Sequence, residues 1–327
     1  MLSTRTSLAE DFAAARAVIP NLADRASEVF ARIREPRAAS PLPGWTVGDV
    51  AVHLGLACSA YAAAAVGDFG VLDRISAENA AADGAAENPA AVAKNAADAE
   101  NNATTPKPPA GLGFDALIAA LPDAAVIDRV GELNALTLAR SGPDAYRATP
   151  ARIKAAAEAI VAATAGRDPA EPCRAPWFGE DVRLRLGTVA GLFLSETLLH
   201  TLDAARASHQ KWPVPPGTAR LIASLAFPEM MPRTADPERA AKLHAVVHLH
   251  LRGGVTIGVD VDGAKVQTVR DPGPGRADCH VSMDPVAFLL ASTGRASRNR
   301  QIAAGRMIPY GRKPWLAPQI ARLFGFP

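Results

Sequence analysis

Apolar side chains over most of the amino-terminal two thirds of the chain recur every three or four residues, the spacing of helices with one buried face. Ser7-Leu8-Ala9-Glu10 and Thr46-Val47-Gly48-Asp49 each place a hydroxyl three residues before an acid, which predicts a capping box at a helix start. The pattern predicts helices over 8–19, 23–34, 46–57, 114–120, 127–139, 150–165 and 188–209.

The pattern changes beyond the proline cluster at 212–216, where prolines stop a helix and stiffen the chain. Alternating apolar and polar positions then predict strands separated by turns that contain glycine. Strands are expected over 245–251, 255–260 and 265–269, helices over 218–231, 285–293 and 315–324, and an earlier extended arm over 182–186. We therefore expect a helical domain over residues 1–212 and a smaller α+β domain over 213–327.

The segment from Glu78 to Gly111 is rich in Ala, Asn and Pro and has no large apolar stripe. Such composition predicts a mobile insertion, with a structured lid as the alternative.

Composition narrows the classes of partner. The formal net charge is +2 and aromatic residues make up 5% of the chain, so neither a polyanion-binding surface nor stacking platforms for nucleic acid are indicated. The amino terminus lacks the apolar core of a signal peptide, and no stretch approaches the ~20 uninterrupted apolar residues of a membrane span. We expect a soluble, cytoplasmic protein with no nucleic-acid or membrane partner. The sequence leaves the oligomeric state open, a homodimer included.

Glu196 and His200 are the first candidates for chemistry. Residues four apart lie about 40° from each other on a helix, so both side chains can reach one ion. Their helix is apolar nearly all round, and a charged carboxylate there costs several kcal/mol unless it is paired or bound to metal. An ordinary Glu–His pair on a helix surface is the alternative.

His53 lies on the apolar stripe of another predicted helix. If the two helices pack together, His53, Glu196 and His200 form a set of two imidazoles and one carboxylate. Catalytic zinc sites use three such ligands and leave a fourth position open. Non-haem iron uses the same set, so Fe²⁺, Ni²⁺ or another divalent ion remains an alternative to Zn²⁺.

Two strings carry a resemblance to a known family. Residues 42–55, LPGWTVGDVAVHLG, and residues 196–207, ETLLHTLDAARA, resemble two motifs of the mycothiol-dependent maleylpyruvate isomerase family, within the DinB-like superfamily. Residues 279–294 and 305–324 are similar to the sterol-carrier-protein-2-like (SCP2-like) domain often fused to it. The resemblance implies a DinB-like four-helix bundle followed by an SCP2-like α+β domain, with zinc bound by His53, Glu196 and His200.

The resemblance also implies mycothiol as a thiol cosubstrate and a small electrophile as substrate. A metal with an open position favours the thiolate, a nucleophile at neutral pH. In an isomerase the thiolate adds to a cis double bond, the single bond rotates and elimination gives the trans product; in a transferase the adduct leaves. Arg306 and Arg312 are candidates for binding an anionic substrate. A hydrolase that uses metal-bound water and a non-enzymatic carrier of apolar ligands are the alternatives.

His244, His248 and His250 form a rival metal pattern, but polar residues that alternate along a strand are typical of its solvent face. His209 and His280 stand alone in the sequence and are expected to be structural or exposed.

Of the three cysteines, Cys58 is badly placed around its helix to pair with His53 and is expected in the core. Cys173 adjoins Arg174, which predicts a lowered thiol pKa. With Cys279 they form no C-x-x-C pair, so neither a disulfide framework nor a cysteine-based zinc site is indicated.

Overall fold

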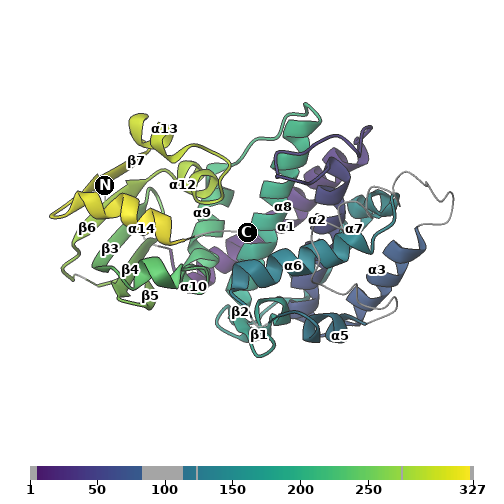
Figure 1. Ribbon diagram of the computed structural model, residues 1–327, viewed down its shortest axis with the longest axis horizontal. Coiled ribbons are helices and arrows are strands. Elements are labelled where there is room, and N and C mark those ends of the chain that lie inside the picture. The colour runs from purple at the N-terminus through teal and green to yellow at the C-terminus, as the bar shows by residue number, and fades with distance from the viewer. Residues whose placement is uncertain (1–5, 83–112, 123, 274, 325–327) are drawn as a thin grey trace.

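Two regions pack side by side in the computed structural model, which describes residues 6–82, 113–122, 124–273 and 275–324. Long helices form one region and a twisted sheet with shorter helices forms the other (Figure 1). This arrangement confirms the predicted fold class, a helical bundle followed by a smaller α+β part.

Four long helices of the first region pack against one another as a bundle. They are α1 (Leu8–Ala31), α2 (Val47–Val66), α7 (Thr149–Ala163) and α8 (Leu186–Ala207). Both predicted capping boxes are present, at the starts of α1 and α2. Large apolar side chains such as Ile19, Leu54, Ile160 and Phe193 fill the centre of the bundle.

The remaining elements of the first region are short and lie against the bundle. They are α3 (Gly70–Ala81), α5 (Phe114–Ala119), α6 (Val126–Ala139), η1 (Ala145–Ala148), η2 (Pro176–Phe178) and the paired strands β1 (Pro172–Arg174) and β2 (Arg183–Arg185). The insertion predicted over Glu78–Gly111 is corrected at its start, because Glu78 and Asn79 belong to α3. The rest of that prediction, from residue 83 on, lies outside the described residues.

The sheet of the second region has the order β5-β4-β3-β6-β7. Its strands are β3 (His244–Leu251), β4 (Thr256–Asp262), β5 (Lys265–Arg270), β6 (Cys279–Met283) and β7 (Met307–Tyr310). All neighbouring pairs are antiparallel except β3 and β6, which are parallel. Its helical elements are α9 (Pro216–Leu225), α10 (Phe227–Arg233), α11 (Pro237–Ala240), α12 (Pro285–Ser292), α13 (Arg298–Ala303), η3 (Pro314–Leu316) and α14 (Ala317–Leu323).

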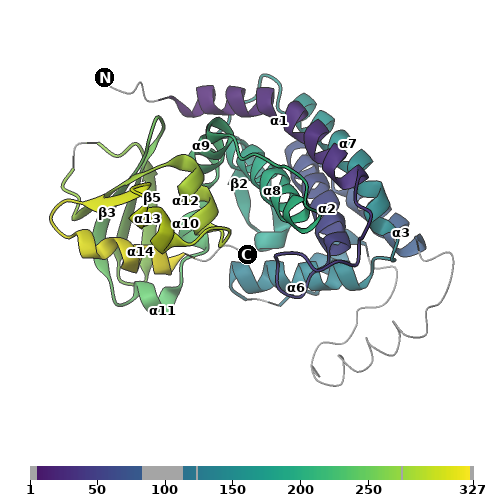
Figure 2. The ribbon, with the colours of Figure 1, turned by 90° about the horizontal axis from the view of Figure 1, so that it is seen from above.

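Helices α9 and α10 lie between the bundle and the sheet (Figure 2). The fully buried Asp11 of α1 joins the two regions there. Its carboxylate accepts hydrogen bonds from Arg220 and Ser224 of α9 and from Arg270 of β5. The domain boundary between residues 212 and 213 stays a prediction.

Two helix predictions are wrong in detail. Helix α1 continues through Pro20 rather than stopping near it, because the loss of one backbone hydrogen bond is outweighed by the buried stripe that continues at Leu22, Ala23 and Ala26. The helix predicted over 218–231 is two helices, α9 and α10.

Among the described residues, α2 alone is long and apolar enough to cross a membrane. Two thirds of its most apolar stretch is buried against the rest of the protein, as in the core helix of a bundle. The apolar character of α2 therefore has a sufficient cause in its packing.

Candidate metal centre

His53 on α2 and Glu196 and His200 on α8 meet where the two helices pack together. The His53 Nε2 atom lies 3.3 Å from Glu196 Oε2, and the His200 Nε2 atom lies 3.0 Å from the same oxygen. The three candidate ligand atoms all lie within 4.8 Å of one another. The helical spacing of Glu196 and His200 and the packing of α2 thus produce the predicted cluster.

The three side chains are largely withdrawn from water, with exposed fractions of 12% for each histidine and 22% for the glutamate. Burial alone would raise the pKa of Glu196, but hydrogen bonds from His200 and His53 outweigh it and hold that pKa well below its usual range. Burial and the nearby charge of His200 lower the pKa of His53. At neutral pH Glu196 is therefore ionised and His53 is neutral, the forms in which each can bind a metal ion.

Asp203 and Arg295 stand behind His200. The Asp203 carboxylate is fully buried and pairs with Arg295 through two guanidinium nitrogens, at 3.0 and 2.6 Å. His200 Nδ1 lies 3.4 Å from Asp203 Oδ2, at the long limit for a hydrogen bond. Burial lowers the pKa of His200, but Asp203 and Glu196 outweigh this and raise it above its usual value.

Trp45 and Asn134 contact the two imidazoles. The Trp45 ring is stacked on His200, with centroids 6.5 Å apart, and meets His53 edge-on at 5.1 Å. Asn134 of α6 lines the same cavity as His53 and acts to raise the pKa of the His53 ring. The contacts with Trp45 restrict the orientation of both rings.

A cavity of about 180 Å³ opens beside the cluster. Most of its wall is apolar and comes from α2, α6, α8 and the Trp177–Phe178 turn. The carboxy-terminal region adds Thr293 and Arg295, and α6 is followed by Arg140, a second guanidinium in the wall. The cluster therefore faces a partly open, mostly apolar cavity with a few charged groups.

The donor set fits a divalent metal ion. Two imidazole nitrogens and a carboxylate oxygen are ligands that Zn²⁺, Fe²⁺ and Ni²⁺ accept. An ionised carboxylate shared by two imidazoles in a largely buried site already has the charge and convergence that such an ion requires. Binding of an ion by these residues stays a prediction.

Comparison with models of known protein families shows to which family the chain belongs. The model of the mycothiol maleylpyruvate isomerase N-terminal domain matches residues 16–205, more than half of the chain. The chain belongs to this family. The model of the SCP-2 sterol transfer family matches residues 227–308. Together the two matches confirm the resemblance inferred from the two sequence motifs.

Solved structures with some likeness to this maleylpyruvate isomerase family member have low identity. A mycothiol-dependent maleylpyruvate isomerase is 12% identical, with 89% of this chain and 91% of that chain covered and a TM-score of 0.42. A histidine-to-alanine mutant of a mycothiol-dependent maleylpyruvate isomerase is also 12% identical, with 90% of this chain and 91% of that chain covered and a TM-score of 0.43. The sec-alkylsulfatase Pisa1 from Pseudomonas sp. is 13% identical, with 43% of this chain and 24% of that chain covered and a TM-score of 0.29. At these TM-scores the likenesses carry no argument, and no curated protein matches the chain.

The structure corrects the predicted roles of two arginines. Arg306 and Arg312 are exposed in the sheet region, and neither lines the cavity. Arg312 pairs with Asp278, 2.5 Å away. The guanidinium groups in the cavity wall belong instead to Arg140 and Arg295.

The cysteine predictions have different outcomes. Cys58 is fully buried as expected, and burial raises the pKa of its thiol to about 12, which excludes it as a nucleophile at neutral pH. The prediction for Cys173 is wrong, because burial raises the pKa of its thiol rather than lowering it. Cys279 is a buried, free thiol in β6.

Sequence reasoning missed Asn134, Arg140 and Arg295. Asn134 was not marked by its own helix, which carries other polar and charged residues such as Asp128 and Glu132. Nothing local marked Arg295, which is 92 residues from Asp203 and reaches it only through the packing of the two regions.

Proposed function

We propose that this chain is a metal-dependent enzyme that uses a low-molecular-weight thiol of the mycothiol type to isomerise, or transfer sulfur to, a small electrophile. His53, Glu196 and His200 would hold the ion, with Zn²⁺ as the first candidate. The observation that carries the proposal is the convergence of these ligand atoms beside the cavity in a member of the maleylpyruvate isomerase family.

The charge of Glu196, the neutral ring of His53 and the apolar cavity wall would each favour this chemistry. A bound ion would supply a Lewis acid that favours the deprotonated form of a coordinating thiol. Glu196 offers a negative charge and His53 a neutral imidazole at neutral pH. The apolar wall limits the number of polar groups around the ion, and water displaced by a bound substrate would strengthen electrostatic interactions within the cavity.

The wall also favours an anionic substrate. Arg140 and Arg295 both lie in the wall, and a guanidinium there could meet a carboxylate, although Asp203 already pairs with Arg295. In an isomerisation, the thiolate adds to the cis double bond, the resulting single bond rotates, and elimination returns the thiol and the trans product. No net proton or electron is consumed.

Conversion of maleylpyruvate in the presence of mycothiol tests the proposal, with zinc per chain measured on the same samples. We expect thiol-dependent turnover that is lost on chelation, restored by Zn²⁺ and lost in His200→Ala. His244→Ala is the matched control, because His244 is exposed on β3 and pairs only with Asp262 in the described structure. Turnover by His200→Ala at the wild-type rate would contradict the metal assignment. Ester hydrolysis without thiol would favour the hydrolase alternative.

A second function, the binding of apolar ligands, is supported by another cavity. This space of about 320 Å³ lies between the sheet and helices α12 and α14, and its lining is almost entirely apolar. Met231, Phe288 and Ile320 contribute to its wall, within or near the part of the chain matched by the SCP-2 sterol transfer family. Binding of a fluorescent fatty acid that survives chelation would support this role, and no binding at micromolar concentrations would exclude it. A homodimer stays a prediction.

A further inference from the structure

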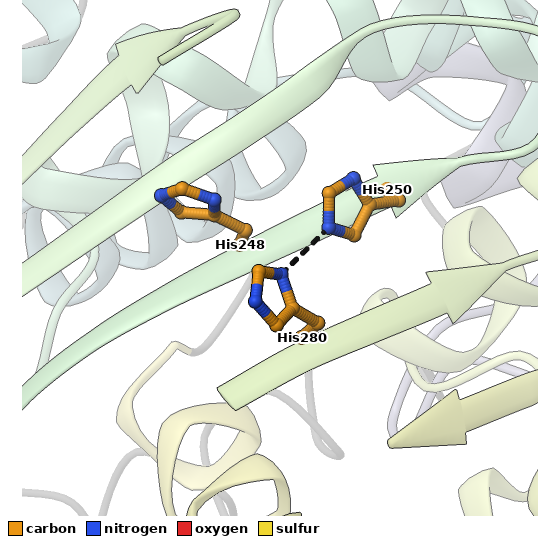
Figure 3. Close-up of side chains that lie close together, drawn as sticks. All are labelled: His248, His250 and His280. Atoms are coloured by element: carbon orange, nitrogen blue, oxygen red, sulfur yellow. Dashed lines mark hydrogen bonds between the residues drawn. The ribbon is translucent and has the colours of Figure 1, made fainter. Parts of the chain in front are cut away.

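Three histidines come together on the sheet, far in sequence from the centre described above. His248 and His250 alternate along β3 and therefore point to the same face, opposite to Val247 and Leu249. In the parallel pairing of β3 and β6, His280 lies directly opposite His248. Figure 3 shows the three rings gathered over this face. His280, expected to stand alone, is thus part of a cluster.

The ring nitrogens lie at separations that a single ion can bridge. His250 Nε2 is 2.9 Å from His280 Nδ1, and one nitrogen from each ring lies within 4.8 Å of the others. A tetrahedral ion at the usual zinc–nitrogen distance holds its nitrogens about 3.3 Å apart. Small rotations of the His248 ring would bring its nitrogen to that distance, because its centroid is 5.3 Å from that of His280.

Neighbouring groups already orient the rings. Thr256 Oγ1 lies 3.1 Å from His250 Nδ1 and can accept a hydrogen bond from the Nδ1–H group, which leaves the Nε2 lone pair directed toward the cluster. The Tyr310 ring is stacked on His280, with centroids 5.1 Å apart. The His280 proton would move from Nδ1 to Nε2 when Nδ1 becomes a ligand, a change of tautomer without a change of charge.

The three rings are partly buried, but an ion can still reach them from the surface. His248 is 8% exposed, and Pro272 covers the neighbouring Gly258, whose added Cβ would lie 3.0 Å from Pro272 Cγ. Burial and the proximity of His280 lower the pKa of His248, so its lone pair is available at neutral pH. His250 and His280 are only half-buried, which leaves a path for an ion.

We propose that His248, His250 and His280 form a second metal site, for a divalent transition-metal ion such as Zn²⁺ or Cu²⁺. An all-imidazole set suits these ions and disfavours Mg²⁺ and Ca²⁺, which prefer oxygen ligands. The alternative, an ordinary polar sheet face, gives no reason for three imidazoles to converge. This site would cross-link β3 and β6 and is independent of the function proposed for the helical centre.

Zinc stoichiometry of the full chain tests the second site. Samples equilibrated with micromolar Zn²⁺ against a weak competing chelator should hold two ions per wild-type chain, one per His200→Ala chain, and none when His280→Ala is added to His200→Ala. His244→Ala, on the same strand but outside the cluster, should hold two. Loss of zinc only by His200→Ala, with His280→Ala equal to wild type, would overturn the proposal, as would binding at the sheet only in millimolar zinc.

A second variant and a second readout guard against misfolding. His250→Gln keeps a polar side chain of similar size, and its circular dichroism spectrum should match that of the wild type. In the His200→Ala background, Zn²⁺ should raise the melting temperature, and His250→Gln should remove this shift. An undiminished shift in a folded His250→Gln protein would overturn the proposal.

Discussion

In the helical bundle, His53 and His200 share the carboxylate of Glu196, whereas on the sheet His250 hydrogen-bonds with His280 and His248 lies beside them. The helical cluster faces a cavity and has a buried aspartate behind it. The sheet cluster lies at a surface, with a threonine hydroxyl behind it. Three imidazoles or two imidazoles and a carboxylate can each hold an ion with an open position, so the ligand sets do not separate the two clusters in function; the cavity beside the helical cluster, which has room for a substrate, does.

The largest effect is expected from a substitution at the contact between the two regions that carry these clusters. Asp11→Asn would leave Arg220 and Arg270 without their buried carboxylate and should lower the free energy of unfolding by about 3–5 kcal/mol. Urea unfolding at pH 7 measures this loss. The exposed pair of Asp24 and Lys154 supplies the control, since Asp24→Asn should change stability by about 1 kcal/mol or less.

The stability difference between wild type and Asp11→Asn should depend on pH. Burial acts to raise the pKa of Asp11, but hydrogen bonds from Ser224, Arg270 and Arg220 outweigh it and lower that pKa. A lowered carboxyl pKa contributes stability above the unfolded value of about 3.9, and this contribution is lost as pH falls through the folded value. The difference between wild type and Asp11→Asn should therefore shrink below about pH 4. A difference that stayed constant down to pH 3 would contradict the assigned charge.

The two ligand sets differ in the carboxylate of Glu196. Glu196→Gln should weaken zinc binding at the helical centre by more than the roughly 10- to 100-fold typical of losing an outer partner, and should leave the sheet cluster unchanged. Isothermal titration of the His280→Ala background isolates the helical centre. Glu158→Gln, at an exposed position of α7, is the control. Equal affinity of Glu196→Gln and wild type would remove Glu196 from the ligand set.

The aspartate behind His200 should have an intermediate effect. Asp203→Asn removes the charge next to Nδ1 and should weaken zinc binding by about 10- to 100-fold. The effect should fall on affinity rather than on stoichiometry at saturating zinc. An unchanged dissociation constant would mean that Asp203 serves Arg295 alone.

The smallest effect is expected behind the sheet cluster. Thr256→Val removes one neutral hydrogen bond to His250 and should weaken zinc binding there by no more than about 10-fold. Titration of the His200→Ala background measures it. A loss as large as that of His250→Gln would mean that Thr256 binds the ion directly.

Local patterns made the helical cluster predictable and, on the sheet, indicated His248 and His250 but not His280. The spacing of Glu196 and His200 is a property of one helix, and the string around His53 carries a motif of the family. His280 meets His248 only through the parallel pairing of β6 with β3, and β6 was not predicted. Strand β7, which brings Tyr310 to the cluster, was not predicted either. Pairing between distant strands leaves no period in the sequence.

The fold class followed from periodicity, but helix ends and buried charges depended on tertiary packing. Helix α1 passes Pro20 because its buried face continues, which the local proline signal cannot reveal. Cys173 is buried by packing in the β1–β2 region, so its neighbour Arg174 was a misleading guide to the thiol pKa.

Arg295 has one further consequence. It follows α12 by three residues, and α12 lines the apolar cavity under the sheet, whereas the Arg295 side chain ends at Asp203 beside His200. A ligand of that cavity that favours one position of α12 would also shift Arg295, and through Asp203 the support of His200. Thermodynamic reciprocity then requires the coupling to run both ways: whatever factor a lipid-like guest imposes on ion affinity, the ion imposes on affinity for the guest.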